Sequence, residues 1–256
     1  MNDLAIADAY ARSDLKIGYI SPLLHTKIVE ILTGNISNSF QELMCMNNDQ
    51  YRSVNLSIQN TINDSHINLL VFKEIQPTLK TWFGTDDFLV QSNVYLRSSR
   101  PTMCQESECI GWHRESFYGS GMESAYNIWI PILGVNADNT LQFIPCSQNV
   151  STDKLNLKNV DDKFTVRYSD GHKLGFLYSP KVITDGLDFT SALRMNVPEY
   201  GFACFPAELI HGAAINNSDH IRYSIDLRVI KRIDHSIDLS KSYHFASGKP
   251  YFISVD

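Results

Sequence analysis

The spacing of the apolar residues changes near Asp87, and this change limits the fold more than any other feature of the chain. From there on, apolar and polar residues alternate along the sequence. One face carries Phe88, Val90, Val94 and Leu96, and the other carries Gln91, Asn93, Tyr95 and Arg97. Such a period of two is typical of a strand. Its polar face either meets solvent or lines the mouth of a barrel that holds a polar ligand.

Helical spacing precedes this change. Over 21–34, Ser21 can cap a helix, Pro22 suits the first turn, and apolar residues recur at helical intervals. A second helix is expected over 64–84. It should bend or stop before Pro77, because proline lacks the backbone N–H that a helix interior needs.

Short strands are expected through most of the remaining chain, separated by turn residues such as Asp138-Asn139 and Asp170-Gly171. The expected strands cover 110–116, 125–133, 139–145, 163–168, 174–179, 201–205, 209–216 and 221–230. Many short strands that follow helices predict a mainly β protein with flanking helices, folded as a jelly roll.

We interpret the whole chain, 1–256, as a single domain, since this length suffices for one barrel with additions. Residues 1–86 are expected to form a mainly helical support, 87–230 the jelly-roll core, and 231–256 a C-terminal extension that packs outside the barrel or against another subunit. A polar insertion at 147–199 interrupts the core, and such loops often cover active sites.

The composition argues against several classes of function. A net charge of −6 and the absence of Lys/Arg runs argue against a protein that holds nucleic acid chiefly through its phosphates. No stretch approaches the roughly 20 apolar residues of a membrane helix, and Met1-Asn2-Asp3 is not typical of a secretion signal. Five cysteines without a repeated close spacing fit reduced thiols. We therefore expect a soluble, cytoplasmic protein whose partner is a small molecule.

A candidate pair of metal ligands, His113 and Glu115, lies in the expected strand 110–116. Residues i and i+2 share one face of a strand, so both side chains would meet one ion while Arg114 points away. With 8 His and 28 acidic residues in 256, about one His-x-Asp/Glu pair is expected by chance. The pair alone therefore fits an exposed strand with a charged end at least as well.

A second histidine, His211, strengthens the metal hypothesis because it lies in another expected strand and could complete the ligand set. Two histidines and one carboxylate occupy three adjacent positions of an octahedral iron and leave three for substrates. This facial triad suits non-haem Fe(II) oxygen chemistry. A closed structural zinc site leaves no such room.

The expected strand that begins at Arg222 alternates sharply. Its polar face carries Arg222, Ser224, Asp226 and Arg228, and its apolar face carries Tyr223, Ile225, Leu227 and Val229. A guanidinium beside a hydroxyl can hold a carboxylate through a bidentate pair of hydrogen bonds and a third bond. An amphipathic outer strand whose charges pair with neighbouring strands is the alternative.

Together these motifs resemble the phytanoyl-CoA dioxygenase-like branch of the Fe(II)/2-oxoglutarate-dependent oxygenases, over 87–230. The resemblance rests on His113-Arg114-Glu115, on Asn127-Ile128-Trp129-Ile130-Pro131-Ile132, on Asn139-Thr140-Leu141-Gln142-Phe143-Ile144-Pro145-Cys146-Ser147, and on His211-Gly212 with Asn216 and Arg222. It implies a cupin-like double-stranded β-helix, iron bound by His113, Glu115 and His211, and Arg222 as the residue that holds the distal carboxylate of 2-oxoglutarate.

Two positions depart from the family pattern. Glu115 replaces the more common aspartate but is a competent ligand. Ala213 stands where a serine is frequent, and Ser224 is expected to supply a hydroxyl near the co-substrate. Because residue 115 is a carboxylate, the resemblance argues against the halogenating members, in which halide takes that coordination position.

The reaction that the resemblance implies couples O2 and the oxidative decarboxylation of 2-oxoglutarate, which yields succinate and carbon dioxide, to oxidation of a C–H bond. Hydroxylation of a small polar metabolite or a specialised-metabolite intermediate is the default. Desaturation, cyclisation or epoxidation would use the same four residues, His113, Glu115, His211 and Arg222.

Further residues are candidates for the pocket around the metal. Asn93 and Tyr95 are expected to contact 2-oxoglutarate. The candidates for substrate contact are Arg97, Trp112, Tyr118, Tyr126, Asn127 and Arg228. Arg97 and Arg228 favour a substrate with a carboxylate or a phosphate, although Arg228 could instead pair with a nearby carboxylate and Trp112 could be a core aromatic.

Three other functions stay open at this point. A nucleobase-demethylating oxygenase fits Ile110-Gly111-Trp112-His113 and the spacing from Arg222 to Arg228, although the acidic balance argues against it. A non-catalytic cupin-like binder of a sugar or metabolite would use His113 and Glu115 only to contact its ligand. A metal-dependent isomerase or hydrolase would need neither oxygen nor 2-oxoglutarate.

Overall fold

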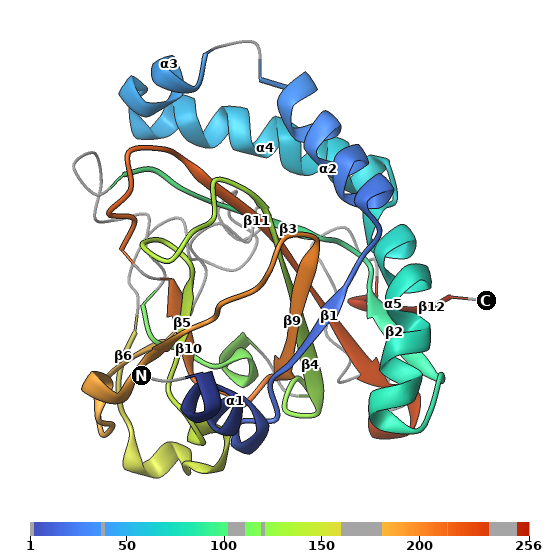
Figure 1. Cartoon of the computed structure of the whole chain (residues 1–256), viewed down its shortest axis with the longest axis vertical. Helices are drawn as coiled ribbons and strands as arrows, with labels where there is room; N and C mark the ends of the chain where they lie inside the picture. Colours follow the sequence, from blue (N-terminus) through green and yellow to red (C-terminus); the bar gives the residue numbers. More distant parts are fainter. Residues whose placement is uncertain are drawn as a thin grey trace.

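The computed structural model describes residues 3–36, 39–101, 111–118, 121–159, 181–213, 215–235 and 250–255. Within these residues, two antiparallel sheets pack against each other, and helices cover the outer face of the larger one (Figure 1). The predicted fold class, mainly β with flanking helices in a cupin-like jelly roll, is confirmed.

The helices of the described residues gather before the first long run of strands. They are α1 (Asp3–Arg12), α2 (Pro22–Gly34), α3 (Phe40–Cys45), α4 (Asn48–Asp64) and α5 (Ile67–Phe83). Short 3-10 helices are η2 (Glu115–Tyr118), η3 (Ser147–Asn149), η4 (Thr152–Lys154), η5 (Phe189–Ser191) and η6 (Arg232–Asp234). The predicted start of α2 is confirmed, because the Ser21 side chain accepts a hydrogen bond from the Leu24 N–H and Pro22 occupies the first turn.

Helix α5 runs through Pro77 to Phe83, so of the two outcomes expected at the proline, a bend or a stop, the stop is wrong, whereas the expected end near Gly84 is confirmed. Ile75 and Leu79, on either side of the proline, are fully buried in the core between helices and sheet. Packing of this face therefore outweighs the one hydrogen bond that Pro77 cannot donate. Gly84 ends the helix with a φ of 71°, in the left-handed region that suits glycine.

Helix α4 was not predicted as a separate element, because buried polar residues interrupt its apolar face. One of them, Gln59, is 2% exposed. Its side-chain amide donates to the carbonyl of Val94, and its amide oxygen accepts from the N–H of Leu96. Gln59 thus attaches α4 to the backbone of the strand that carries Tyr95 and Arg97.

The larger sheet has the strand order β1-β9-β4-β11-β2-β12, and β3 also pairs with β11. Its strands are β1 (Lys16–Tyr19), β2 (Phe88–Gln91), β3 (Tyr95–Ser99), β4 (Ala125–Leu133), β9 (Gly201–Pro206), β11 (Arg222–Lys231) and β12 (Phe252–Ser254). The smaller sheet has the order β10-β5-β8, with β5 (Leu141–Phe143), β8 (Leu193–Arg194) and β10 (His211–Ala213). A separate pair is formed by β6 (Asn156–Asn159) and β7 (Lys181–Asp185).

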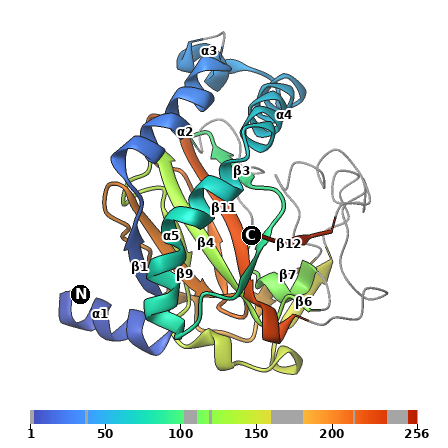
Figure 2. The same ribbon diagram turned by 90° about the vertical axis from the view of Figure 1, so that its right-hand side faces the viewer.

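Strand β11 has the two faces that its alternation predicted. Tyr223, Ile225, Leu227 and Val229 pack in one core with residues of α2, α4 and α5, and Figure 2 shows α2 and α5 along this outer face of the sheet. On the inner face of the sheet, Trp129 and Phe205 pack with Phe143 of the smaller sheet. The polar residues of β11 therefore face the space between the two sheets.

The other expected strands have mixed outcomes. Those at 125–133, 201–205 and 221–230 are confirmed as β4, β9 and β11. Those at 139–145 and 209–216 are shorter than predicted, as β5 and β10. The strands expected at 163–168 and 174–179 lie outside the described residues.

The described end of the C-terminal extension, residues 250–255, joins the larger sheet. Strand β12 pairs with β2, with Phe252 opposite Gln91 and Ser254 opposite Leu89. This part of 231–256 therefore packs on the core of its own chain. The division of the chain into support, core and insertion stays a prediction. No helix in the described part of the chain is long and apolar enough to cross a membrane.

We expect Gln59→Leu to lower the free energy of unfolding by about 2–4 kcal/mol, because the substitution removes the hydrogen-bond partner of the buried Val94 carbonyl and of the Leu96 N–H. Urea denaturation measures the change. Gln41→Leu, at an exposed position of α3, is the matched control and should change the stability little. Equal midpoints for the two variants would contradict this role of Gln59.

Candidate metal centre

His113 and His211 lie side by side because their backbones pair. The N–H of each residue donates to the carbonyl of the other, at 3.0 Å in both directions. Strand β10 is held in turn by β5, with His211 opposite Phe143. The two imidazole centroids are 4.5 Å apart. The smaller sheet thus fixes both rings.

Glu115 reaches the same place by a route that differs from the predicted strand. The chain turns after His113, and Glu115 begins the 3-10 helix η2. The Glu115 N–H donates to the carbonyl of Ala207 at 2.8 Å. The expectation that His113 and Glu115 share the face of one continuous strand was therefore wrong, since a turn directs the carboxylate toward the rings.

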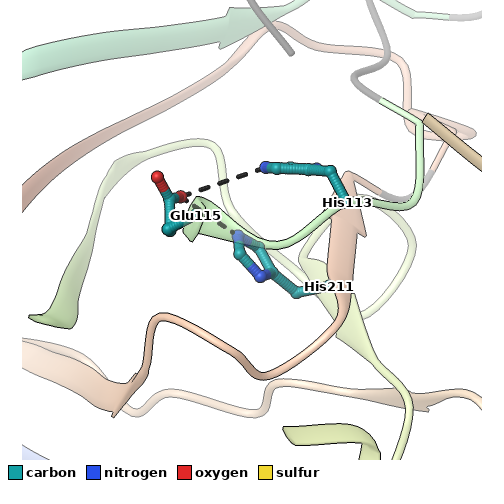
Figure 3. Close-up of side chains that lie close together, drawn as sticks. All are labelled: His113, Glu115 and His211. Carbon is teal, nitrogen blue, oxygen red and sulfur yellow. Dashed lines mark ion pairs between the residues drawn. The ribbon is translucent and has the colours of Figure 1, made fainter. Parts of the chain in front are cut away.

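The structure brings the three predicted ligands together (Figure 3). One ring nitrogen from each histidine and one oxygen of Glu115 all lie within 4.8 Å of one another. Oε1 of Glu115 is 3.5 Å from Nε2 of His211 and 4.0 Å from Nε2 of His113. All three side chains are buried.

Both histidines present Nε2 to this group, because the other ring nitrogen is engaged. Nδ1 of His113 is 2.8 Å from the carbonyl oxygen of Gly111, and Nδ1 of His211 is 2.8 Å from that of Leu209. A carbonyl oxygen only accepts, so Nδ1 carries the proton in each ring. Burial, and then the neighbouring His211, lower the pKa of His113 to about 3. His113 is thus a neutral imidazole whose Nε2 is free to bind a metal.

Glu115 is ionised despite its burial. Burial by itself would raise the pKa of this carboxyl, but the positive charge of Arg228 outweighs it, so the pKa lies well below its usual range. Nε of Arg228 donates to Oε2 at 2.8 Å, and Nδ2 of Asn127 donates to Oε1 at 2.9 Å. Imidazole nitrogens together with a carboxylate oxygen suit iron and other first-row metals. The residues present therefore fit an iron ligand set.

Arg228 contacts the protein and not open space, contrary to the expectation that it holds substrate. Besides its bonds to Glu115, its Nη1 donates to Oε1 of Gln91 and to the hydroxyl of Tyr251, both at 3.1 Å. The side chain is 1% exposed. The structure instead shows the alternative, in which Arg228 pairs with a nearby carboxylate, that of Glu115.

Arg97, on β3, is a second arginine of the inner face. Its Nε and Nη2 donate to the two oxygens of Asp226 at 2.9 and 3.1 Å. Its Nη1 is buried without a partner among the described residues. The ring of Tyr95 lies 5.4 Å from the Arg97 guanidinium carbon, and the ring of Tyr118 lies 6.0 Å from that of His113. Several of the predicted pocket residues therefore do lie around the triad.

Arg222 and Ser224 lie farther along the inner face of β11. Ser224 stands opposite Arg97 of β3, and its buried hydroxyl has no partner among the described residues. Nη1 of Arg222 donates to the carbonyl of Asn139 at 3.0 Å. The two residues thus share with Arg228 the face of the strand that was expected to hold the co-substrate.

Three predicted pocket residues are placed elsewhere. Tyr126 lies on the outer side of the sheet, with its ring centroid 4.4 Å from that of Phe83. Trp112 packs with Phe189 at 5.7 Å in a separate apolar cluster. Asn93 is half-buried in the bend between β2 and β3, and no described contact joins it to the triad.

Sequence reasoning missed Gln91, Asp226 and Tyr251 as parts of this centre. Gln91 and Asp226 do lie on the polar faces that the alternation indicated. The signal available for Asp226 was its position between Arg222 and Arg228 on the polar face of β11. Tyr251 left no signal, because its position depends on how the chain end packs on β2.

No protein-family model and no curated protein matches the chain. Membership of the phytanoyl-CoA dioxygenase-like branch therefore stays a prediction.

Solved structures with a similar fold belong to non-haem 2-oxoglutarate-dependent proteins. One is the alpha ketoglutarate dependent epimerase SnoN from nogalamycin biosynthesis, with a TM-score of 0.50 and 12% identity over 99% of this chain and 95% of that one. Another is EvdO2 from Micromonospora carbonacea var. aurantiaca complexed with 2-oxoglutarate, with a TM-score of 0.47 and 16% identity over 62% of this chain. The chain spans 59% of EvdO2, less than two thirds. At these identities the similarity to SnoN shows the fold.

We expect the protein to bind one divalent ion, and His113→Ala or His211→Ala to weaken this binding by more than about 100-fold, since losing a ligand costs more than losing a residue that only orients one. Isothermal titration with Co(II), and with Fe(II) under anaerobic conditions, measures the affinity. His25→Ala is the control, because His25 lies on α2 against the ring of Tyr200. Unchanged affinity in both ligand variants would remove the metal from this site.

Proposed function

We propose that the protein is an Fe(II)/2-oxoglutarate-dependent dioxygenase that hydroxylates a C–H bond of a small polar metabolite. The observation that carries this proposal is the buried group of His113, Glu115 and His211, whose ring nitrogens and carboxylate oxygen all lie within 4.8 Å of one another. Three protein ligands on one side of an octahedral ion leave three positions for a chelating co-substrate and oxygen. A carboxylate at residue 115 supports hydroxylation over halogenation, because no ligand position is left for halide.

We assign Arg222 and Ser224 to the distal carboxylate of 2-oxoglutarate. Both lie on the inner face of β11, the face that also carries Arg228 beside the metal ligands. A guanidinium holds a carboxylate by charge and by paired hydrogen bonds. The buried Ser224 hydroxyl, which lacks a partner among the described residues, would supply another.

The chain's own residues hold the reactants in place and exclude water. When bound, Fe(II) with 2-oxoglutarate and O2 supplies the oxidation of the C–H bond, with succinate and carbon dioxide as co-products. The backbone carbonyls of Gly111 and Leu209 fix the ring orientations, and the pairing with Arg228 fixes the carboxylate. Burial of all three ligands keeps bulk water from the reacting atoms.

We infer that the substrate carries a hydrogen-bond acceptor that meets Arg97. This guanidinium has a buried Nη1 without a partner among the described residues, and its charge acts on His113 of the triad. A buried donor without a partner costs about 1–3 kcal/mol, and a substrate carboxylate, carbonyl or hydroxyl oxygen would remove that cost. Of the two arginines expected to contact the substrate, we therefore keep Arg97 in this role and not Arg228.

We expect purified protein supplied with Fe(II), O2 and 2-oxoglutarate to form succinate slowly, and faster with a matching metabolite. Mass spectrometry scores succinate and a gain of one oxygen atom in a mixed metabolite pool. A hydrolase, an isomerase or a non-catalytic binder on the same fold would form no succinate. Succinate production that persists without added metal after chelation would contradict the proposal.

For Arg222→Ala we expect the KM for 2-oxoglutarate to rise by about 10- to 100-fold, the loss of a charge-assisted hydrogen bond. The affinity for Co(II) should stay as in the unmodified protein, because the described hydrogen bond of Arg222 goes to the Asn139 carbonyl and not to a metal ligand. Arg12→Ala, an exposed arginine paired with Asp8, is the control. An unchanged KM would place the co-substrate anchor elsewhere.

A further inference from the structure

We propose that Tyr251 is a positioning residue for the metal ligand Glu115, acting through Arg228, so that the C-terminal segment 250–255 is a working part of the metal centre. The inference rests on the proposed function in one respect, that Glu115 binds a metal ion.

Arg228 determines how the carboxylate of Glu115 is turned. Its Nε and Nη2 both contact Oε2, while the other oxygen, Oε1, receives Asn127 and lies on the side of the imidazoles. A carboxylate held in this way offers one oxygen to a metal and keeps the other on the arginine. The Arg228 guanidinium therefore sets the orientation of the ligand, as groups that hydrogen-bond to metal ligands do in other sites.

The position of the Arg228 guanidinium is fixed at its other end by two acceptors. Gln91 uses one oxygen to accept from both the backbone N–H and Nη1 of Arg228, at 3.0 and 3.1 Å. The Tyr251 hydroxyl accepts from the same Nη1 at 3.1 Å. The rings of Tyr95 and Tyr118 lie 5.1 and 5.5 Å from the guanidinium carbon. Removing the Tyr251 hydroxyl would leave a buried guanidinium nitrogen with one acceptor fewer.

Tyr251 is delivered to this position by the pairing of the chain end with β2. The N–H of Ser92 donates to the carbonyl of Tyr251, and the Ser92 hydroxyl donates to that of Pro250, each at 2.8 Å. Strand β12 then continues along β2 as an edge strand. Tyr251 itself is 4% exposed. The hydroxyl that completes the surroundings of Arg228 thus comes from a segment that only long-range strand pairing holds there.

The experiment uses the full chain and Co(II) alone, with affinity measured by titration calorimetry. We expect Tyr251→Phe to bind Co(II) about tenfold more weakly and Arg228→Met about 100-fold more weakly, the range seen when groups that orient ligands are lost. Arg228→Lys should fall between Arg228→Met and the unmodified protein, because a single ammonium cannot contact Glu115, Gln91 and Tyr251 together.

A double-mutant cycle separates positioning from general stability. If Tyr251 acts through Arg228, adding Tyr251→Phe to Arg228→Met leaves the Co(II) affinity at the value of Arg228→Met. If the tyrosine merely stabilises the fold, its effect on affinity is additive or absent, and either result overturns the proposal. Tyr126→Phe, a half-buried tyrosine on the outer face of the sheet, is the matched control and should bind Co(II) normally.

The outcomes also distinguish this inference from the proposed function. Unmodified protein that fails to bind Co(II) removes the metal centre, and with it both proposals. Normal binding by the unmodified protein together with normal binding by Tyr251→Phe removes only the role of the chain end. Circular dichroism of each variant confirms that the compared proteins are folded.

Discussion

The whole site depends on the fact that β11 is buried on both faces. Its apolar side chains pack under the helices, so its alternating charges must face the space between the two sheets. A charge buried there without a partner is costly, and breaking a buried pair costs about 3–5 kcal/mol. Arg228 meets Glu115, and Asp226 meets Arg97. Because β11 is buried on both faces, the charge of Arg228 needs a carboxylate from another element. The metal ligand Glu115 supplies it.

Two separate backbone arrangements converge on that carboxylate. The pairing of His113 with His211 fixes the rings through the smaller sheet, whereas Glu115 is directed by the turn into η2 and by Arg228 of the larger sheet. The distances among the three ligands therefore depend on how the two sheets pack against each other. Apolar contacts between Trp129, Phe205 and Phe143 maintain that packing. The geometry of the site therefore depends on the packing of both sheets and not on one local segment.

The sequence predicted the parts of this site that depend on local patterns, and it failed where contacts between distant segments decide the structure. Alternation along 222–229 is a local pattern, and both faces of β11 were predicted correctly from it. The grouping of His113, Glu115 and His211 was predicted from their resemblance to a motif, but the strand assumed for the first two was wrong, because the hydrogen bond from Glu115 to Ala207 is a tertiary contact. Burial likewise overrode the local preference at Pro77. Tyr251 has no local signature, since only pairing with β2 gives it a place.

The charges of the buried network bear on what the metal would require. Arg228 offsets Glu115, and Arg97 offsets Asp226, so this network of four ionised side chains has no net charge. Histidines bind metals as neutral imidazoles. A divalent ion held here would therefore keep most of its charge uncompensated by the protein, and low-polarity surroundings strengthen its attraction for anions. Under the proposed function, the negative charge of 2-oxoglutarate would offset this positive charge. The arginine that orients Glu115 thereby also favours an anionic co-substrate over a water-filled site.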